Sequence, residues 1–423
     1  MHQIINDPSY FSSDTVPSKN FEHYSKVHQD FTPAYRQFLI NFSKSLEGIE
    51  FLVDLREKYL ELPFQDKATF PIQLLSYELF RLLQLCFSPA FLKLQRITWG
   101  SPTALLERVA VLESVHPIRS WLDLKSRLGP YRRVFVNTHP ALGEYQPVII
   151  LHTALVDHIP SSVDSLISQQ SSIANTEGNL VENRDKIKAA IFYSISSPQK
   201  GLKGIELGGV MIKSVVREIN REFPKLNIFS TISPIPNFRA WLSEQMNKHV
   251  DTLASPAFQS FFTINTGVDE EKKFVMNLRS FLDDNFSSPN QYQEQCPSSE
   301  KVYFHFEGQK FEVKDMLIYF CTFYLTCMKS KSNKVLNSVA HFHLTNGAQL
   351  WRLNWNANIN PRGIQSSFGI MANYRYYIAK TDLLNTQYLE HGTVSLSSSV
   401  HEVYQSIPEN FRTCKCSHQE FDD

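Results

Sequence analysis

The chain has 423 residues, and its 42 Lys and Arg side chains balance its 42 Asp and Glu side chains, so the formal net charge is zero. The length predicts two or three domains, and a hydrophobic fraction of 42% is enough for sizeable cores. Because phosphate neutralisation needs an excess of Lys and Arg, this balance argues against a nucleic-acid binder that works by bulk electrostatics. A small, local anion site stays open.

The termini and the cysteines bear on the cellular compartment. Acidic residues and no Lys or Arg occupy the first 18 positions, which fits neither a secretory signal nor an Arg-rich transit peptide. The acidic C-terminus is not a peroxisomal address, and the longest nearly apolar run, 316–328, is shorter than the ~20 residues of a membrane span. Six cysteines are few for the length and fit a reducing compartment. We therefore expect a cytoplasmic protein without a membrane span.

The tail holds one candidate metal cluster. Cys414, Cys416 and His418 have side chains that bind metals, but no second cluster stands nearby to complete a tetrahedral site. An ordinary polar tail is the favoured interpretation, and we expect no metal.

In chain order, residues 1–30 are predicted to form a polar arm and residues 31–115 a helical block. Apolar residues in this block recur at spacings of one, three and four, as on amphipathic helices. Ser101 and Pro102 supply an N-cap and a first-turn proline for a helix over 102–115. The apolar faces favour packing between helices or between subunits. We therefore expect a helical oligomerisation domain.

Residues 116–408 are predicted to form a mixed α/β domain, because strand-like and helix-like segments alternate. Runs rich in β-branched and aromatic residues predict strands over 131–138, 148–155, 187–195 and 227–232. Helices are expected over 162–170, 210–222 and 313–330. Short strands are expected after 340, and a polar tail over 409–423.

A glycine cluster lies between a predicted strand and a predicted helix. Four of the 15 glycines stand at 201, 204, 208 and 209. A turn of this kind lets backbone N–H groups approach an anion, and the helix dipole favours negative charge there. Lys200 and Lys203 add positive charge, so a phosphate or pyrophosphate is the expected guest. The spacing matches neither a Walker loop nor a dinucleotide fingerprint, and a tight turn with close helix packing is the alternative.

Ser233 is a candidate catalytic hydroxyl. It stands where a predicted strand ends, and Pro234 restricts it to extended conformations. A rigidly held hydroxyl at a strand end suits catalysis, although a Ser-Pro pair also commonly ends a strand.

His343 is a candidate acid or base. His341 and His343 would share one face of a strand, but no further metal ligands stand nearby at typical spacing. A neutral histidine that works as an acid or base is therefore the better interpretation of His343, and His341 is expected to be structural. A turn at Asn346 and Gly347 would display the Asn346 amide as a donor. The Asn- and aromatic-rich stretch 351–377 favours strands that line a cleft over a surface for single-stranded nucleic acid.

The residues in these clusters resemble the malonyl-CoA decarboxylase family. The resemblance covers roughly residues 31–380 and is carried by long, unusual motifs: Gly-Pro-Tyr-Arg-Arg (129–133), Ala-Ile-Phe-Tyr-Ser-Ile-Ser (190–196), Phe-Ser-x-x-Ser-Pro-Ile-Pro (229–236), His-Leu-x-Asn-Gly-Ala (343–348), Trp-Arg-x-Asn-Trp (351–355) and Met-Ala-Asn-Tyr-Arg-Tyr (371–376).

The resemblance implies an N-terminal helical bundle followed by an acetyltransferase-like (GNAT-type) α/β catalytic domain. It implies conversion of malonyl-CoA to acetyl-CoA and CO2 in fatty-acid metabolism, without a metal or biotin, by a tetramer built as a dimer of dimers. Mitochondrial and peroxisomal locations also occur in the family.

The family's catalytic serine and histidine map onto Ser233 and His343. Its CoA-binding loop maps onto Lys203, Gly204, Ile205, Glu206, Leu207, Gly208 and Gly209. We hypothesise that His343 protonates the carbon and that Ser233 holds the leaving carboxylate. The remaining candidates are Glu206, to orient His343, Asn346, to hold the thioester oxygen, and Tyr376, to contact the substrate.

Three departures from the family pattern stand out. The helical block is shorter at its N-terminus, the interval from Ser233 to His343 is longer, and the targeting signals of some relatives are missing. The longer interval predicts an insertion near 251–300. A CoA-dependent N-acyltransferase and a non-catalytic acyl-CoA sensor are the alternative functions.

Overall fold

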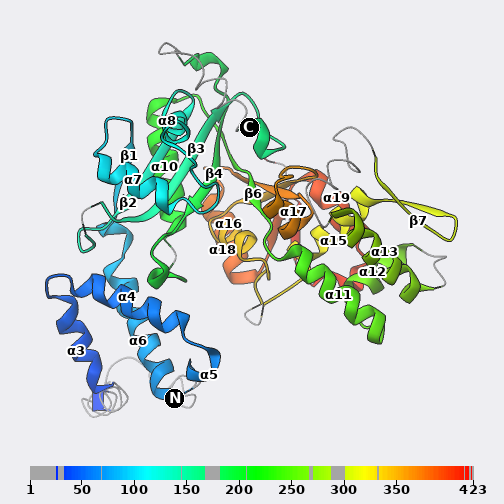
Figure 1. Cartoon of the computed structure of the whole chain (residues 1–423), viewed down its shortest axis with the longest axis horizontal. Helices are drawn as coiled ribbons and strands as arrows, with labels where there is room; N and C mark the ends of the chain where they lie inside the picture. Colours follow the sequence, from blue (N-terminus) through cyan, green and yellow to red (C-terminus); the bar gives the residue numbers. More distant parts are fainter. Residues whose placement is uncertain are drawn as a thin grey trace, which may run out of the picture. The chain divides into compact units, whose positions relative to one another are not determined.

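The computed structural model describes residues 25–26, 33–67, 69–143, 145–166, 182–205, 207–265, 270–286, 301–330, 333–413, 415–418 and 421. The chain divides into two compact units, which Figure 1 traces in sequence colours. The first unit is the chain up to Leu92 with the segments His139–Glu144 and Gln199–Ile205. The second unit comprises Lys93–Thr138, Tyr145–Pro198 and Glu206–Asp423.

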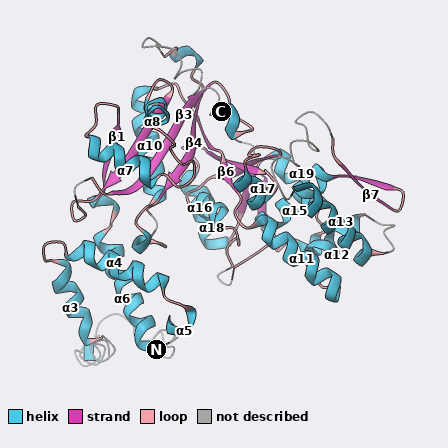
Figure 2. Ribbon diagram, viewed as in Figure 1, coloured by secondary structure: helices cyan, strands magenta, loops and turns pink. Residues whose placement is uncertain are grey.

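The first unit is helical, and Figure 2 shows it as cyan ribbons. Its helices are α3 (Ala34–Ser43), α4 (Gly48–Glu61), α5 (Phe64–Lys67) and α6 (Phe70–Cys86), followed by the short turn η2 (Pro89–Phe91). α3, α4 and α6 contact one another. Leu52 and Val53 of α4 and Leu79 and Leu83 of α6 are almost wholly buried, so the apolar stripes pack together as the sequence pattern predicts.

The second unit is built on one mixed sheet. In the part of the chain that the structure describes, its strands are β1 (Lys93–Ile97), β2 (Arg132–Thr138), β3 (Pro147–Val156), β4 (Ala189–Ser196), β5 (Ile228–Thr231), β6 (Ser233–Pro234), β9 (Gln349–Asn354), β10 (Met371–Tyr376), β11 (Val394–Leu396) and β12 (Cys416–His418). They lie in the order β1-β2-β3-β4-β5-β10-β9-β11-β12, with β6 paired to β10. The pairs from β1 to β4 are antiparallel, whereas β4 and β5 are parallel and joined through α10 (Gly208–Glu222).

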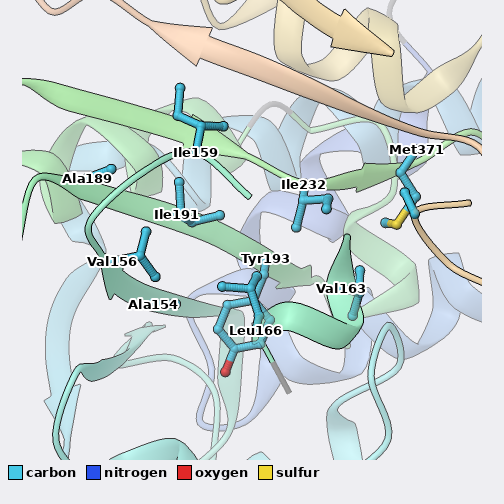
Figure 3. Close-up of a cluster of buried hydrophobic side chains, with 11 residues drawn as sticks. Ala154, Val156, Ile159, Val163, Leu166, Ala189, Ile191, Tyr193, Ile232 and Met371 are labelled. Atoms are coloured by element: carbon cyan, nitrogen blue, oxygen red, sulfur yellow. The ribbon is translucent and has the colours of Figure 1, made fainter. Parts of the chain in front are cut away.

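Helices cover both faces of this sheet. On one face, α7 (Thr103–Leu112) and α8 (Trp121–Leu128) pack on Val134 and Ile150. A second cluster that includes Ala154, Ile191 and Met371 continues this face (Figure 3). Because side chains alternate along a strand, Phe192 points to the other face, and its partner in β5, Thr231, shares that face.

The remaining helices surround the second half of the sheet. They are α11 (Phe238–Thr252), α12 (Pro256–Ile264), α13 (Glu271–Phe286), α15 (Val313–Thr326), α16 (Ser338–Thr345), α17 (Pro361–Ser367), α18 (Thr381–His391) and α19 (Ser398–Ser406). α11 to α13 and α15 contact one another and the hairpin of β7 (Tyr303–Phe306) and β8 (Gln309–Glu312). α16 contacts α10, α18 and β9, which places it over the region of the candidate catalytic residues.

The predicted fold class, helices followed by a mixed α/β domain, is confirmed, and three local predictions are wrong. His341 and His343 lie on helix α16 and not on a strand, because Asn337 caps the segment through the N–H of Ala340. Lys93–Ile97, predicted as part of the helical block, is a strand that pairs with β2. The predicted helix over 102–115 exists as α7, but it packs on the sheet of the second unit. The helix expected over 162–170 is described only up to residue 166.

The sequence also predicted that the chain has no membrane span and that residues near 251–300 are an insertion. Within the described ranges, no helix combines the length and the apolar character needed to cross a bilayer. The described parts of 251–300 form α12 and α13, and whether they are an insertion stays a prediction.

Candidate active site

Ser233 lies at a break in the sheet. The parallel ladder of β4 and β5 ends at Phe192 and Thr231, whereas β4 runs on to Ser196. Beyond Ile232 the chain pairs only with β10, through Ser233 and Ala372. The Ser233 hydroxyl is therefore held by a strand on one side and lies where β4 and its neighbour are no longer hydrogen-bonded.

The structure brings Ser233 and His343 together, 110 residues apart in sequence. Ser233 Oγ lies 2.9 Å from His343 Nε2, and both residues are buried. On the other side of the ring, His343 Nδ1 lies 2.8 Å from the hydroxyl of Tyr376. The His343 ring also stacks on Tyr374, with the ring centroids 4.5 Å apart. His343 is thus fixed by two hydroxyl groups and one aromatic face.

Burial keeps the His343 imidazole neutral. The pKa of His343 is lowered to about 3 because the buried ring has lost the water that would stabilise its charged form. The hydrogen-bond partners of its ring, Ser233 and Tyr376, are neutral hydroxyls, which stabilise an imidazolium much less than a carboxylate would. Burial likewise raises the pKa values of Tyr374 and Tyr376 well above their ordinary range. At neutral pH the site therefore carries no formal charge on these groups.

The sequence analysis missed Thr231 and Tyr374. Ser233 donates a hydrogen bond to Thr231 Oγ1 at 2.9 Å, and the backbone N–H of Tyr374 donates to the same oxygen at 3.1 Å. Their spacing could have identified them. Thr231 lies two residues before Ser233, and Tyr374 lies two residues before Tyr376, so in a strand each pair shares one face. Tyr376 contacts His343 in this structure, and its predicted contact with the substrate stays a prediction.

The last two glycines of the cluster have a packing role. A Cβ atom on Gly208 would lie 2.1 Å from the Phe342 ring, and one on Gly209 would lie 1.8 Å from Asn346 Oδ1. The start of α10 therefore approaches the end of α16, the helix that carries His343. Asn346 also donates its amide to the carbonyl of Phe342 at 2.7 Å, which uses one of its two N–H groups.

The other two glycines and both lysines of the cluster belong to the first unit. Gly201 packs on α4, where a Cβ atom would lie 2.0 Å from the carbonyl oxygen of Val53. Gly204 has a φ of +89° and space for a Cβ, so its requirement for glycine is conformational. Buried Arg56 donates to the carbonyls of Gly201 and Lys203. These hydrogen bonds from Arg56 to backbone carbonyls hold the turn on α4.

One of the two lysines of the predicted anion loop already forms ion pairs within the first unit. Lys200 Nζ lies 3.1 Å from Glu57 and 3.1 Å from Glu61 on α4, so these carboxylates neutralise its charge locally. Ile205 and Leu207 belong to the first and second unit, respectively. Glu206, predicted to orient His343, lies outside the described residues.

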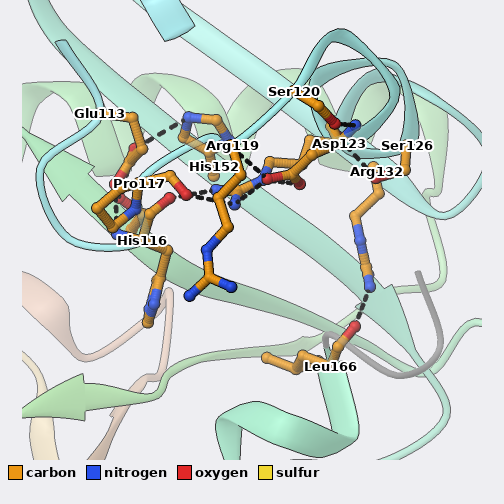
Figure 4. Close-up of polar contacts among 12 residues, drawn as sticks. Glu113, His116, Pro117, Arg119, Ser120, Asp123, Ser126, Arg132, His152 and Leu166 are labelled. Carbon is orange, nitrogen blue, oxygen red and sulfur yellow. Dashed lines mark hydrogen bonds and ion pairs between the residues drawn. The ribbon is translucent and has the colours of Figure 1, made fainter. Parts of the chain in front are cut away.

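A charged cluster lies on the opposite face of the sheet, beside the end of β4 (Figure 4). Glu113 lies 3.1 Å from His152 Nε2, and both side chains are fully buried. Ser194 donates to both oxygens of Glu113, at 2.7 and 2.8 Å, and the backbone N–H groups of Val115 and His116 donate to one of them. Despite desolvation, these bonds lower the pKa of Glu113 to about 2.

A cavity of about 1150 Å³ opens beside this cluster. Its lining includes His116, Arg119 and Arg362 and, next to the catalytic candidate, Pro234. Figure 4 shows the His116 ring and the Arg119 guanidinium extending toward the same side. Strand β6 thus carries Ser233 beside His343 and Pro234 at the wall of this cavity.

The structure offers little support for a metal centre. In the described ranges, no three His, Cys, Asp or Glu side chains gather closely enough to hold a metal ion. Cys416 and His418 lie on β12, whereas Cys414 of the predicted cluster lies outside the described residues.

A buried, neutral Ser–His pair flanked by tyrosines thus lies on a mixed α/β sheet, an arrangement of the kind that enzymes use for acid–base chemistry. A family model described as "Malonyl-CoA decarboxylase C-terminal domain" matches residues 90–414. The chain therefore belongs to the malonyl-CoA decarboxylase family.

Individual relatives agree with this assignment. The chain is 35% identical over 389 residues to "Malonyl-CoA decarboxylase, mitochondrial" of Anser anser anser, covering 91% of this chain and 72% of that protein. It is 34% identical to the Mus musculus protein of the same name, covering 91% and 74%. The crystal structure of malonyl-CoA decarboxylase from Rhodopseudomonas palustris matches with a TM-score of 0.71 and 28% identity over 90% of this chain and 82% of that one. The structure from Agrobacterium vitis matches with a TM-score of 0.70 and 26% identity over 95% and 86%.

Proposed function

We propose that the chain decarboxylates malonyl-CoA to acetyl-CoA and CO2 by acid–base catalysis at Ser233 and His343. The observation that carries the proposal is the buried 2.9 Å contact between these two side chains, in a chain that belongs to the malonyl-CoA decarboxylase family. Their motifs are those on which the sequence resemblance rests.

The reaction needs one proton for each turnover. When the bond between the carboxylate carbon and the α-carbon breaks, CO2 leaves and the electron pair stays on the thioester as an enolate. The enzyme must stabilise the charge on the thioester oxygen and then add a proton to the α-carbon. His343 is the proposed proton donor. The negative charge of the bound carboxylate raises the pKa of a nearby imidazole, which favours a proton on the ring until CO2 has left.

Ser233 is proposed to hold the departing carboxylate through its hydroxyl and to exchange protons with His343. Asn346 is proposed to hold the thioester oxygen with the amide N–H that is not used by Phe342. The buried position of His343 and Tyr376 supports this division, because hydrogen bonds to a developing charge are stronger where water is excluded.

Binding of CoA by the segment Lys203–Gly209, including Glu206, is part of the proposal. The start of α10 at Gly208 supports it, because the first backbone N–H groups of a helix favour an anion. Lys203 is a better candidate than Lys200 for a cation that contacts CoA, because Lys200 already pairs with two glutamates.

The assembly and the compartment are also part of the proposal. Exposed apolar side chains on the helices of the first unit, including Phe38, Phe51 and Phe70, favour a homo-oligomer, and the family resemblance favours a tetramer. The sequence prediction is a cytoplasmic protein, whereas the curated relatives are named mitochondrial. Size-exclusion chromatography with light scattering tests the assembly, and cell fractionation tests the compartment.

Incubation of the purified protein with malonyl-CoA alone tests the activity. We expect release of CO2 and an equal amount of acetyl-CoA without an acceptor. Turnover only after an amine is added would instead identify an N-acyltransferase. Binding of malonyl-CoA without turnover would indicate an acyl-CoA sensor.

A further inference from the structure

The direction of one hydrogen bond determines the proton order of the whole site. The Ser233 hydroxyl donates to Thr231 Oγ1 at 2.9 Å. A hydroxyl has only one proton, so its 2.9 Å contact with His343 Nε2 must be donated by the ring. The neutral ring then has no proton on Nδ1, which accepts the hydroxyl proton of Tyr376 at 2.8 Å. The order is therefore Tyr376 to His343 to Ser233 to Thr231.

We propose that Thr231 is a positioning residue: in the substrate-free site its hydroxyl oxygen accepts a hydrogen bond from Ser233 and thereby keeps the N–H of His343 Nε2 directed at Ser233 until a substrate carboxylate binds. The proposal rests on the proposed function, because it assigns to His343 the donor form that protonation of the enolate carbon requires.

Thr231 is held in place by strand β10, at a point where the backbone ladder is interrupted. The nearest backbone pairs of β10 are Arg375 with Ser230 before Thr231 and Ala372 with Ser233 after it. The two positions between them, Tyr374 and Asn373, bond to Thr231 through side-chain atoms.

Each of these bonds replaces a ladder bond. The N–H of Tyr374 donates to Thr231 Oγ1 at 3.1 Å, and Asn373 Nδ2 donates to the Thr231 carbonyl at 2.6 Å. Asn354 donates in turn to Asn373 Oδ1 at 2.8 Å, and Arg352 does so at 3.2 Å. Hydrogen bonds thus hold Thr231 at its side-chain oxygen and at its backbone carbonyl. Because Oγ1 is fixed in this way, it stays in position to accept the hydrogen bond from Ser233.

Three variants test the role of Thr231. Thr231→Val keeps the shape and removes the acceptor, so we expect kcat to fall at least about 10-fold with KM changed by less than about 3-fold. Thr231→Ser restores an acceptor and should restore most of kcat. Ser230→Ala is the matched control: it removes a buried hydroxyl that donates to the Tyr374 carbonyl at 3.1 Å, in the same strand pair, without touching Ser233. It should keep kcat.

The tautomer of His343 provides a readout that needs no substrate. In the ¹⁵N spectrum of the full-length, histidine-labelled protein, with the signal assigned by its loss in His343→Gln, we expect the proton on Nε2. In Thr231→Val the Ser233 proton has only Nε2 as acceptor, so the ring proton should move to Nδ1.

Specific results would overturn the proposal. A folded Thr231→Val variant with unchanged kcat would do so, as would a wild-type His343 with its proton on Nδ1 or an equal loss of kcat in Ser230→Ala. If Thr231→Val does not fold, the wild-type tautomer still decides. If the wild type releases no CO2 from malonyl-CoA, the proposed function fails, whereas the proton order is still tested by the tautomer.

Discussion

Two buried histidines in the second unit share a sheet but differ in their partners. His343 has 3% of its surface exposed and lies between the hydroxyls of Ser233 and Tyr376. His152 has 0% exposed, points to the opposite face and lies 3.1 Å from the carboxylate of Glu113. Both rings have lost their water, so the partner decides whether a charge can persist.

The difference lies in the groups that face each ring. Neutral hydroxyls face His343, and burial lowers the pKa of its ring to about 3. Around Glu113, four donors besides His152 stabilise the ionised carboxylate, which fixes the loop after α7 to β3 and β4. The first arrangement suits proton transfer, and the second suits structure.

The largest expected effect comes from removing the neutral histidine. His343→Ala should lower turnover at least about 10²-fold, because general acid catalysis contributes about 10²–10⁴-fold. Binding of acyl-CoA should be largely kept. His341→Ala is the matched control, since His341 lies two residues earlier on α16 and bonds Tyr388 Oη at the same 2.8 Å. Steady-state CO2 release and acyl-CoA titration measure both, and unchanged turnover in His343→Ala would refute its role.

The buried pair of Glu113 and His152 should respond in stability instead. Glu113→Gln replaces the fully buried carboxylate that faces His152 and accepts several hydrogen bonds, and leaving buried donors unsatisfied costs about 1–3 kcal/mol. Urea unfolding measures this loss, and kcat of the folded fraction should stay near the wild-type value. Glu107→Gln, at an exposed position of α7, is the control and should change stability by less than about 0.5 kcal/mol. A loss of kcat without a loss of stability would assign Glu113 to catalysis.

Acid should weaken the protein in two overlapping pH ranges that begin at different pH values. The pKa of His343 is about 3 in the folded chain and 6.5 in the reference state, so as pH falls below 6.5 the unfolded chain takes a proton that the native chain does not. Stability therefore decreases toward pH 3, by roughly 1.4 kcal/mol per pH unit at most. The pKa of Glu113 is about 2 against 4.5, so its stabilisation is present above pH 4.5 and is lost as pH falls toward 2.

Variants should distinguish the two groups. In urea unfolding measured from pH 7 to pH 3, His343→Gln should reduce the slope of the curve everywhere below pH 6.5, whereas Glu113→Gln should reduce it only below pH 4.5. If both variants kept the wild-type slope throughout, other groups would control the acid response.

The sequence predicted most of what local patterns determine. The strands around 131–138, 148–155 and 187–195 and the helix after the glycine cluster follow from periodicity and composition and are present as β2, β3, β4 and α10. Ser233 and His343 were selected by a resemblance, and the structure places them 2.9 Å apart. Their catalytic roles stay a prediction.

The contacts that the sequence could not predict are those between residues distant in the chain. The spacing of His341 and His343 suits a strand as well as a helix, and the cap at Asn337 decided for the helix. The role of Thr231 depends on a contact that the sequence does not show, because its Oγ1 accepts hydrogen bonds both from nearby Ser233 and from Tyr374, which is 143 residues away. The glycines at 208 and 209 were interpreted as an approach for an anion, but only the position of α16 shows what a Cβ would meet.

The smallest expected effect tests this packing role of the glycines. Gly209→Ala would place a Cβ atom 1.8 Å from Asn346 Oδ1, so the Asn346 side chain or the end of α16 must shift, at a cost of about 1–2 kcal/mol. Gly100→Ala is the control, because the nearest atom to its Cβ would lie 3.8 Å away. We expect Gly209→Ala to lower the melting temperature and kcat together, since α16 carries His343. If the melting temperature is unchanged while the Kd for CoA rises, Gly209 serves the approach of an anion, and its contact with Asn346 is incidental.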